Sequence, residues 1–200
     1  LVEYIAKKKK PVILSTGMNT ISSINKSVKI LKKYKVDFAL LHCTNLYPTP
    51  SHLVKLNAIN QMKKKFKNVP IGLSDHTEDI YSCLASVALG AAIIEKHFVD
   101  TKKMNGPDVS CSMDPKELEN LIHGSRTIYN SLKGDKIPSK EEKVTMNFAF
   151  ASVAATSDIR KGEIFTKENI FTIRPSNGDF KINDYNKLIG KKASKDLKKG

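Results

Sequence analysis

The chain has 200 residues, of which 40% are hydrophobic, so it can bury the core of one large domain or of a medium and a small domain. It contains no apolar run near the ~18 residues of a membrane span and no visible secretory signal, so we expect no membrane partner. The net charge is +14, but only three of the 34 basic residues are arginines, which nucleic-acid readers favour, so we expect no nucleic-acid partner.

Short apolar runs alternate with amphipathic segments through the first two thirds of the chain. Because these runs are continuous, they are typical of strands buried on both faces of a parallel sheet. Thr20 or Asn19 caps the first helix after a strand, and Asp114 followed by Pro115 begins the last. Strands are predicted at residues 11–15, 38–42, 69–74 and 91–95, and helices at 19–33, 53–66, 77–89 and 115–132.

Two α/β architectures fit four consecutive βα units, a doubly wound sheet and a (βα)8 barrel. The chain has neither a GxGxxG segment nor a Walker loop. Its polar residues gather directly after each predicted strand, which is where barrel enzymes build their active sites. The pattern therefore favours the carboxyl-terminal half of a (βα)8 TIM-type barrel.

The sequence changes character after Leu132. The next residues are charged and rich in turn formers, which predicts a linker. Short β-like segments follow at 150–155 and 171–174, so we predict a separate small β-rich domain that is incomplete at its end. The domains are predicted at residues 1–132 and 148–200, with the linker at 133–147.

The three cysteines, Cys43, Cys83 and Cys111, are odd in number and have neither CxxC nor zinc-finger spacing. This usage predicts reduced thiols and a cytoplasmic location. The chain begins at Leu1 within helix-like sequence and stops at a Lys-Gly turn. We therefore interpret it as an internal piece of a longer protein.

Two histidines follow neighbouring predicted strands. Because side chains alternate along a strand, Ser74 shares a face with His76, and Glu95 shares one with His97, if each strand extends that far. Adjacent strands lie ~4.8 Å apart, so both imidazoles can meet at one divalent cation such as Mn²⁺ that keeps positions open for substrate. Two unrelated histidines at strand tips explain the spacing equally well.

Three further polar features have ordinary explanations when they are taken alone. Residues 42–50 form a proline-stiffened loop that carries Asn45 and Tyr47, and Asp108 belongs to a turn signal. Arg174 fits an exposed surface arginine beside a rigid turn. Lys96 lies next to the predicted site, where we expect it to influence which substrate fits.

Six segments, in order along the chain, resemble the N-acetylneuraminate synthase family, and FAFASVAATSDIRKGEIFTKENI at 148–170 resembles the start of its antifreeze-like (SAF) domain. The resemblance implies a (βα)8 barrel linked to a β-clip SAF domain. It also implies a domain-swapped homodimer in which each SAF domain covers the barrel mouth of the partner. The six segments are STGM at 15–18, HCTNLYPTP at 42–50, IGLSDHT at 71–77, EKHF at 95–98, GPD at 106–108 and RPSNGDF at 174–180.

The resemblance further implies the reaction. Phosphoenolpyruvate condenses with an N-acyl amino hexose such as N-acetylmannosamine, giving a nine-carbon 2-keto acid of the N-acetylneuraminate type and phosphate. A diacetamido sugar, leading to a legionaminate- or pseudaminate-type acid, is the alternative. The implied cofactor is a divalent metal, Mn²⁺ first and Mg²⁺ or Co²⁺ as alternatives.

Roles for individual residues follow from the same resemblance. It implies metal ligands at His76 and His97, and an acid/base or water-orienting group at Glu95. It implies phosphoenolpyruvate contacts from Ser15, Asn45 and Ser74, amino-sugar contacts from Tyr47 and Asp108, and a contact to the N-acyl group from Arg174 of the other subunit. A non-catalytic, SAF-type carbohydrate-binding protein is the alternative from another class, but it gives no reason for paired histidines at strand ends.

Overall fold

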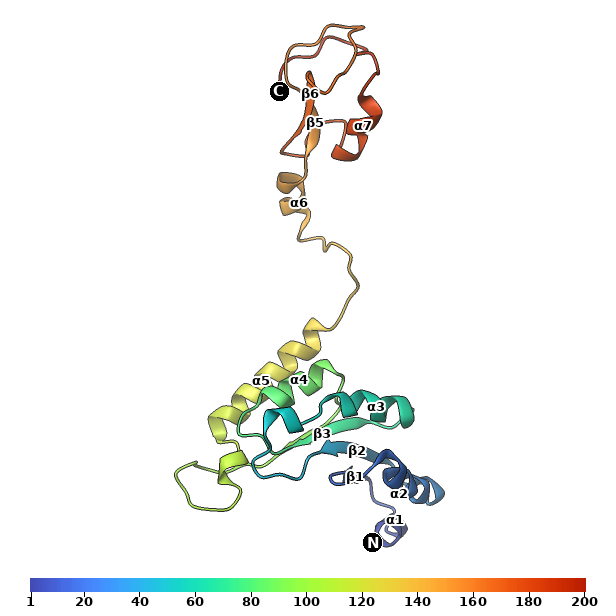
Figure 1. Cartoon of the computed structure of the whole chain (residues 1–200), viewed down its shortest axis with the longest axis vertical. Coiled ribbons are helices and arrows are strands. Elements are labelled where there is room, and N and C mark those ends of the chain that lie inside the picture. Colours follow the sequence, from blue (N-terminus) through green and yellow to red (C-terminus); the bar gives the residue numbers. More distant parts are fainter. The chain divides into compact units, whose positions relative to one another are not determined.

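The computed structural model describes all 200 residues, which form two compact units, Leu1–Lys133 and Gly134–Gly200 (Figure 1). A four-stranded sheet with its helices makes up the first unit, and a two-stranded sheet lies in the second. In neither unit does a helix have the length and hydropathy needed to cross a bilayer.

The sheet of the first unit is parallel throughout, as predicted. Its strands are β1 (Val12–Ser15), β2 (Phe38–Cys43), β3 (Ile71–Asp75) and β4 (Ile94–Lys96). They lie side by side in the order β1-β2-β3-β4, so each strand pairs with the next one along the chain. A doubly wound sheet reverses its strand order at a switch point, and this sheet has no reversal, which favours the barrel.

Helices follow each strand, and two of their predicted starts are confirmed. The Thr20 side chain accepts a hydrogen bond from the Ser23 amide at the start of the first of these helices. Asp114 and Glu117 form a reciprocal capping box at the start of the last. The helices are α1 (Val2–Lys7), α2 (Ile21–Lys33), α3 (Asn57–Lys65), α4 (Tyr81–Ala88) and α5 (Pro115–Ser131).

Three predicted starts were wrong by three or more residues. Helix α3 begins four residues late because Ser51–Leu53 forms a separate 3₁₀ turn, η1. Helix α4 also begins four residues late, at Tyr81, whose amide donates to the Asp79 carboxylate at 3.0 Å. Strand β4 begins three residues late, because Gly90, with φ of +80°, and the residues after it lead the chain out of α4.

The core of the first unit lies between the sheet and its helices. Leu40 of β2 and Leu73 of β3 are fully or almost fully buried, and they pack with Ile59 and Met62 of α3. The Cys83 thiol of α4 lies in the same cluster, and burial raises its pKa well above the usual range. This packing fixes the strands, and with them the loops at their carboxyl ends.

The second unit is small and contains an antiparallel strand pair close to both predicted β segments. Strand β5 (Ser152–Ala155) pairs with β6 (Ile170–Ile173) over a small core built around Ile159 and Ala193. Three short helical elements had no prediction from the sequence. They are α6 (Lys143–Ala149), the 3₁₀ turn η3 (Ile182–Asp184) and α7 (Tyr185–Leu188).

Candidate active site at the strand ends

The rings of His76 and His97 lie edge to face, with their centroids 5.2 Å apart and their planes at 86°. Strands β3 and β4 stop one residue before each histidine, yet the parallel register still brings the two imidazoles together. The Tyr47 ring lies 4.0 Å from that of His76 and 5.8 Å from that of His97, between ring centroids. Three residues predicted from distant segments therefore form one aromatic cluster.

His76 is held in one tautomer. Its Nδ1 lies 2.9 Å from the Thr44 carbonyl oxygen, which can only accept a hydrogen bond, so Nδ1 carries the proton. In the neutral imidazole, Nε2 then has its lone pair available. A ring nitrogen bonded to a backbone carbonyl, with the other nitrogen free, is the usual arrangement of a histidine that binds a metal. His76 therefore fits a divalent cation through Nε2.

Glu95 lies between two serine hydroxyls. Ser74 Oγ donates to Glu95 Oε1 at 2.6 Å, and Ser15 Oγ donates to the same oxygen at 3.2 Å. The three residues come from the ends of β3, β4 and β1, and Ser74 is the direct strand partner of Glu95. This part of the site thus contains the Glu95 carboxylate and two serine hydroxyls. Both hydroxyls can rotate to donate to a bound anion.

Asn45 lies against the loop that follows β1. Its Oδ1 accepts a weak hydrogen bond from the Cys43 thiol at 3.3 Å. A methyl group built on Gly17 would lie 1.5 Å from that same oxygen, so no larger residue fits at 17 while Asn45 keeps its position. The glycine of the STGM segment therefore positions the amide.

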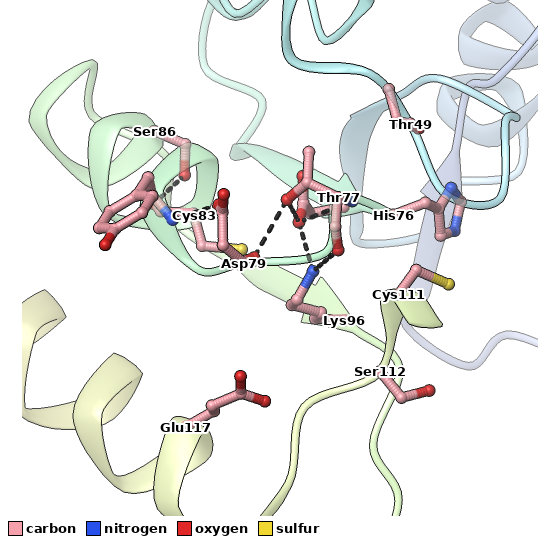
Figure 2. Close-up of polar contacts among 12 residues, drawn as sticks. Thr49, His76, Thr77, Asp79, Cys83, Ser86, Lys96, Cys111, Ser112 and Glu117 are labelled. Atoms are coloured by element: carbon pink, nitrogen blue, oxygen red, sulfur yellow. Dashed lines mark hydrogen bonds and ion pairs between the residues drawn. The ribbon is translucent and has the colours of Figure 1, made fainter. Parts of the chain in front are cut away.

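Lys96 does not point into this site, which corrects the prediction that it influences substrate fit there. Figure 2 shows its side chain directed toward Thr77, away from the His76 ring. Lys96 Nζ lies 2.6 Å from Asp75 Oδ2 and 2.6 Å from the Thr77 carbonyl oxygen, and both charged side chains are 1% exposed. Because side chains alternate along a strand, the residue between Glu95 and His97 faces the other side of the sheet.

Two cysteines lie beside the histidines, and sequence reasoning did not place them there. Cys43 Sγ is 3.9 Å from His76 Nδ1, and Cys111 lies close to His97 and Asp108. Burial raises the pKa of both thiols. A signal for Cys43 existed in the sequence, because it stands two residues before Asn45 at the end of a predicted strand.

Arg174 lies in the second unit, directly after β6, with an exposed side chain. It lines a cavity of about 540 Å³ in that unit. Four lysines and one carboxylate, Asp179, line the same cavity, so its wall is positive on balance although Lys198 is paired with Asp158. The lysines are Lys191, Lys192, Lys195 and Lys198.

Residues 1–137 match the NeuB family, and residues 150–200 match the SAF domain. Two relatives from Campylobacter jejuni are each 42% identical to this chain. One is N,N'-diacetyllegionaminic acid synthase, matched over 98% of this chain and 60% of its own length. The other is pseudaminic acid synthase, matched over 100% of this chain and 58% of its own length.

A solved structure shares the fold. The N-acetylneuraminic acid synthetase of Leptospira borgpetersenii, crystallised in complex with citrate, is 38% identical, with a TM-score of 0.67. The match covers 72% of this chain and 51% of that chain. The chain spans 58% to 60% of the length of the two Campylobacter relatives.

Proposed function

Since the chain belongs to the NeuB family, with half of a TIM-type (βα)8 barrel followed by a SAF domain, we propose that it is part of a sugar-acid synthase that condenses phosphoenolpyruvate with an N-acyl amino hexose. The products are a nine-carbon 2-keto sugar acid and phosphate. The observation that carries this proposal is the pair of imidazoles at neighbouring strand ends, beside the carboxylate and hydroxyls of Glu95, Ser74 and Ser15.

We assign a divalent cation, Mn²⁺ by preference, to Nε2 of His76 and a ring nitrogen of His97. The free lone pair of His76 supports this assignment. When bound, such an ion supplies Lewis-acid polarisation of the sugar's open-chain aldehyde. The Tyr47 ring packs against both imidazoles.

Ser15, Ser74 and Asn45 are our proposed donors to phosphoenolpyruvate. The sheet fixes the positions of the serine oxygens, and the two hydroxyl hydrogens have only to rotate from Glu95 toward the dianion to stabilise its charge. The net charge of +14 adds a field that attracts it. When both hydroxyls turn to the substrate, the Glu95 carboxylate is released to orient the water that adds at C2 and to accept its proton. Carbon C3 attacks the aldehyde, and phosphate leaves by C–O cleavage.

The amino sugar is assigned to Tyr47 and Asp108, with the N-acyl group reached by Arg174 of the partner subunit. The exposed position of the arginine, in a unit with a positively charged cavity, is compatible with such a role. A domain-swapped homodimer would close the barrel mouth and keep bulk water from the reaction. Three free, buried cysteines support the cytoplasmic location that we propose.

The test is a substrate panel on the full-length protein. Phosphoenolpyruvate, Mn²⁺ and a series of amino sugars are incubated with it, and phosphate release and product mass are measured. The 42% identity to the two Campylobacter enzymes favours a diacetamido sugar as a second candidate beside N-acetylmannosamine. Turnover with either sugar supports the synthase. Binding of sugars with no phosphate release from any member would instead indicate a non-catalytic carbohydrate-binding protein.

A glycine substitution tests the placement of Asn45. We expect Gly17→Ala to raise the KM for phosphoenolpyruvate by roughly tenfold or more, because the new methyl group displaces the amide and one charge-assisted hydrogen bond is worth about 1.5–3 kcal/mol. Asn45→Ala should do the same. The KM of the double variant should be close to that of Asn45→Ala, because the amide that the Gly17→Ala methyl group would displace is already absent. Full additivity of the two effects in steady-state kinetics would contradict the assignment.

A further inference from the structure

A second set of metal-binding atoms shares His97 with the proposed catalytic site. Ligand atoms of His97, Asp108 and Cys111 all lie within 4.8 Å of one another. His97 Nδ1 is 3.6 Å from Asp108 Oδ2, and the thiol of Cys111 belongs to a fully buried residue. An imidazole, a carboxylate and a thiol converge here, and nothing in the proposed reaction uses the sulfur.

The backbone holds these three residues in place. Asp108 precedes the 3₁₀ turn η2 (Val109–Cys111), and its carbonyl accepts the Cys111 amide at 3.2 Å and the Ser112 hydroxyl at 2.7 Å. The chain after the turn is tied back to His97, whose carbonyl accepts the Met113 amide at 2.8 Å. The cluster is thus built from two backbone segments that are hydrogen-bonded to each other, which is more than a chance meeting of mobile side chains.

The spacing suits a small, thiophilic cation. Zinc binds nitrogen and oxygen at about 2.0–2.2 Å and thiolate at about 2.3 Å, which puts tetrahedral ligands about 3.4–3.6 Å apart. The His97–Asp108 distance already has this value, and the Asp108 side chain is 47% exposed and free to adjust. Three protein ligands with one open position are typical of zinc sites that also bind a small molecule.

We propose that His97, Asp108 and Cys111 form a binding site for Zn²⁺ or a similarly soft divalent cation, and that this ion and the catalytic metal exclude each other. On binding, the Cys111 thiol gives up the proton that it donates to the Asp108 carbonyl at 3.3 Å, this proton passes to solvent, and the thiolate sulfur bonds to the ion. A neutral imidazole has one unprotonated nitrogen, so His97 can serve only one ion at a time. The competition between the two ions rests on the proposed function, because it requires a catalytic metal at His97. The zinc site itself does not depend on that function.

Zinc should therefore inhibit the synthase. Nitrogen and sulfur ligands bind Zn²⁺ more tightly than Mn²⁺, so low concentrations of Zn²⁺ would displace the catalytic ion from His97. The inhibition would be relieved by excess Mn²⁺. It would be weakened in Cys111→Ser, which removes the sulfur and leaves the residues of the proposed catalytic site in place.

The direct test is a Cd²⁺ titration of the metal-free, full-length protein. We expect the ultraviolet charge-transfer band of a cadmium–thiolate bond, saturating with one ion per chain. Cys111→Ser should abolish the band and weaken Zn²⁺ binding by roughly 100-fold or more, since even residues outside the ligand shell are worth 10–100-fold. Asp108→Asn, at a half-exposed residue with little risk to folding, should weaken it by at least about tenfold.

Cys43→Ser and Cys83→Ser are the matched controls, and both should keep the band. A band that survives in Cys111→Ser, or that disappears in Cys43→Ser instead, would overturn the site. So would normal Zn²⁺ affinity in Asp108→Asn. The cadmium signal does not depend on turnover, so it separates failure of this site from failure of the proposed synthase reaction, which is measured by phosphate release with Mn²⁺.

Discussion

Replacing His76 with alanine in the full-length protein is expected to lower turnover with phosphoenolpyruvate and its sugar by about 10³-fold or more. Removing one of the two proposed metal ligands would forfeit several kcal/mol of the charge stabilisation that the cation supplies when bound, and each 1.36 kcal/mol is a factor of ten in rate. The reason for choosing His76 is geometric. Its Nδ1 donates to the Thr44 carbonyl, which leaves Nε2 as the nitrogen that can bind an ion or substrate.

The matched control is His123→Ala. His123 lies exposed on α5, so its loss should leave the rate unchanged. Because His76 is 6% exposed, circular dichroism must show that its alanine variant folds. Mn²⁺ binding, followed by electron paramagnetic resonance, should weaken in His76→Ala and stay the same in His123→Ala. Equal turnover in both variants would refute the metal assignment.

Breaking the buried Asp75–Lys96 pair is expected to cost about 3–5 kcal/mol of unfolding free energy, because it leaves one charge buried without its partner. Either Lys96→Met or Asp75→Asn should do this. Both side chains are 1% exposed, with Nζ and Oδ2 2.6 Å apart, and Asp75 also accepts from the Thr77 hydroxyl at 2.7 Å. Urea unfolding of the full-length protein, followed by circular dichroism, measures the change.

An exposed pair is the control. Lys116 and Glu119 lie 2.7 Å apart on α5 with side chains 73% and 70% exposed, so Lys116→Met should leave the unfolding free energy almost unchanged. Replacing both Asp75 and Lys96 with apolar residues should cost less than the two single changes together, since no unpaired charge then remains. Single variants at the buried pair that cost no more than Lys116→Met would contradict this account.

The Asp75–Lys96 ion pair also affects the positions of the two histidines, because its residues are their neighbours in the sequence. Asp75 and Thr77 flank His76, and Lys96 directly precedes His97. The ion pair therefore joins the two strand ends on the face opposite the imidazoles, where α4 packs on β3 and a buried leucine of α5 joins the same core. Loss of either charge should loosen the spacing between the two rings and weaken Mn²⁺ binding, in addition to lowering stability.

Much of the fold followed from the sequence alone. Continuous apolar runs, caps such as Thr20 and the Asp114–Pro115 start depend on residues close together in the chain, so the sequence could predict them. The sequence offered the meeting of His76 and His97 as one of two equally good explanations of their spacing, and the ring contact in the structure decides for it. The resemblance of the motifs to the N-acetylneuraminate synthase family added the expectation that the edge of the sheet with these two histidines carries the active site.

Other features needed the tertiary structure. Alternation along β4 could have placed Lys96 opposite Glu95, but only the strand register pairs it with Asp75. The tautomer of His76 depends on a carbonyl 32 residues away, and Cys111 reaches His97 through a bridge between separate backbone segments.

The helices α3 and α4 begin late for a similar reason. A 3₁₀ turn occupies the segment before α3, and α4 begins only at Tyr81, whose amide donates to the Asp79 carboxylate. Local pattern determines where strands and helices form, because propensity and periodicity act over a few residues. The partners of individual polar groups are decided by contacts through space, because a buried donor or acceptor takes whichever group the packed fold brings to it.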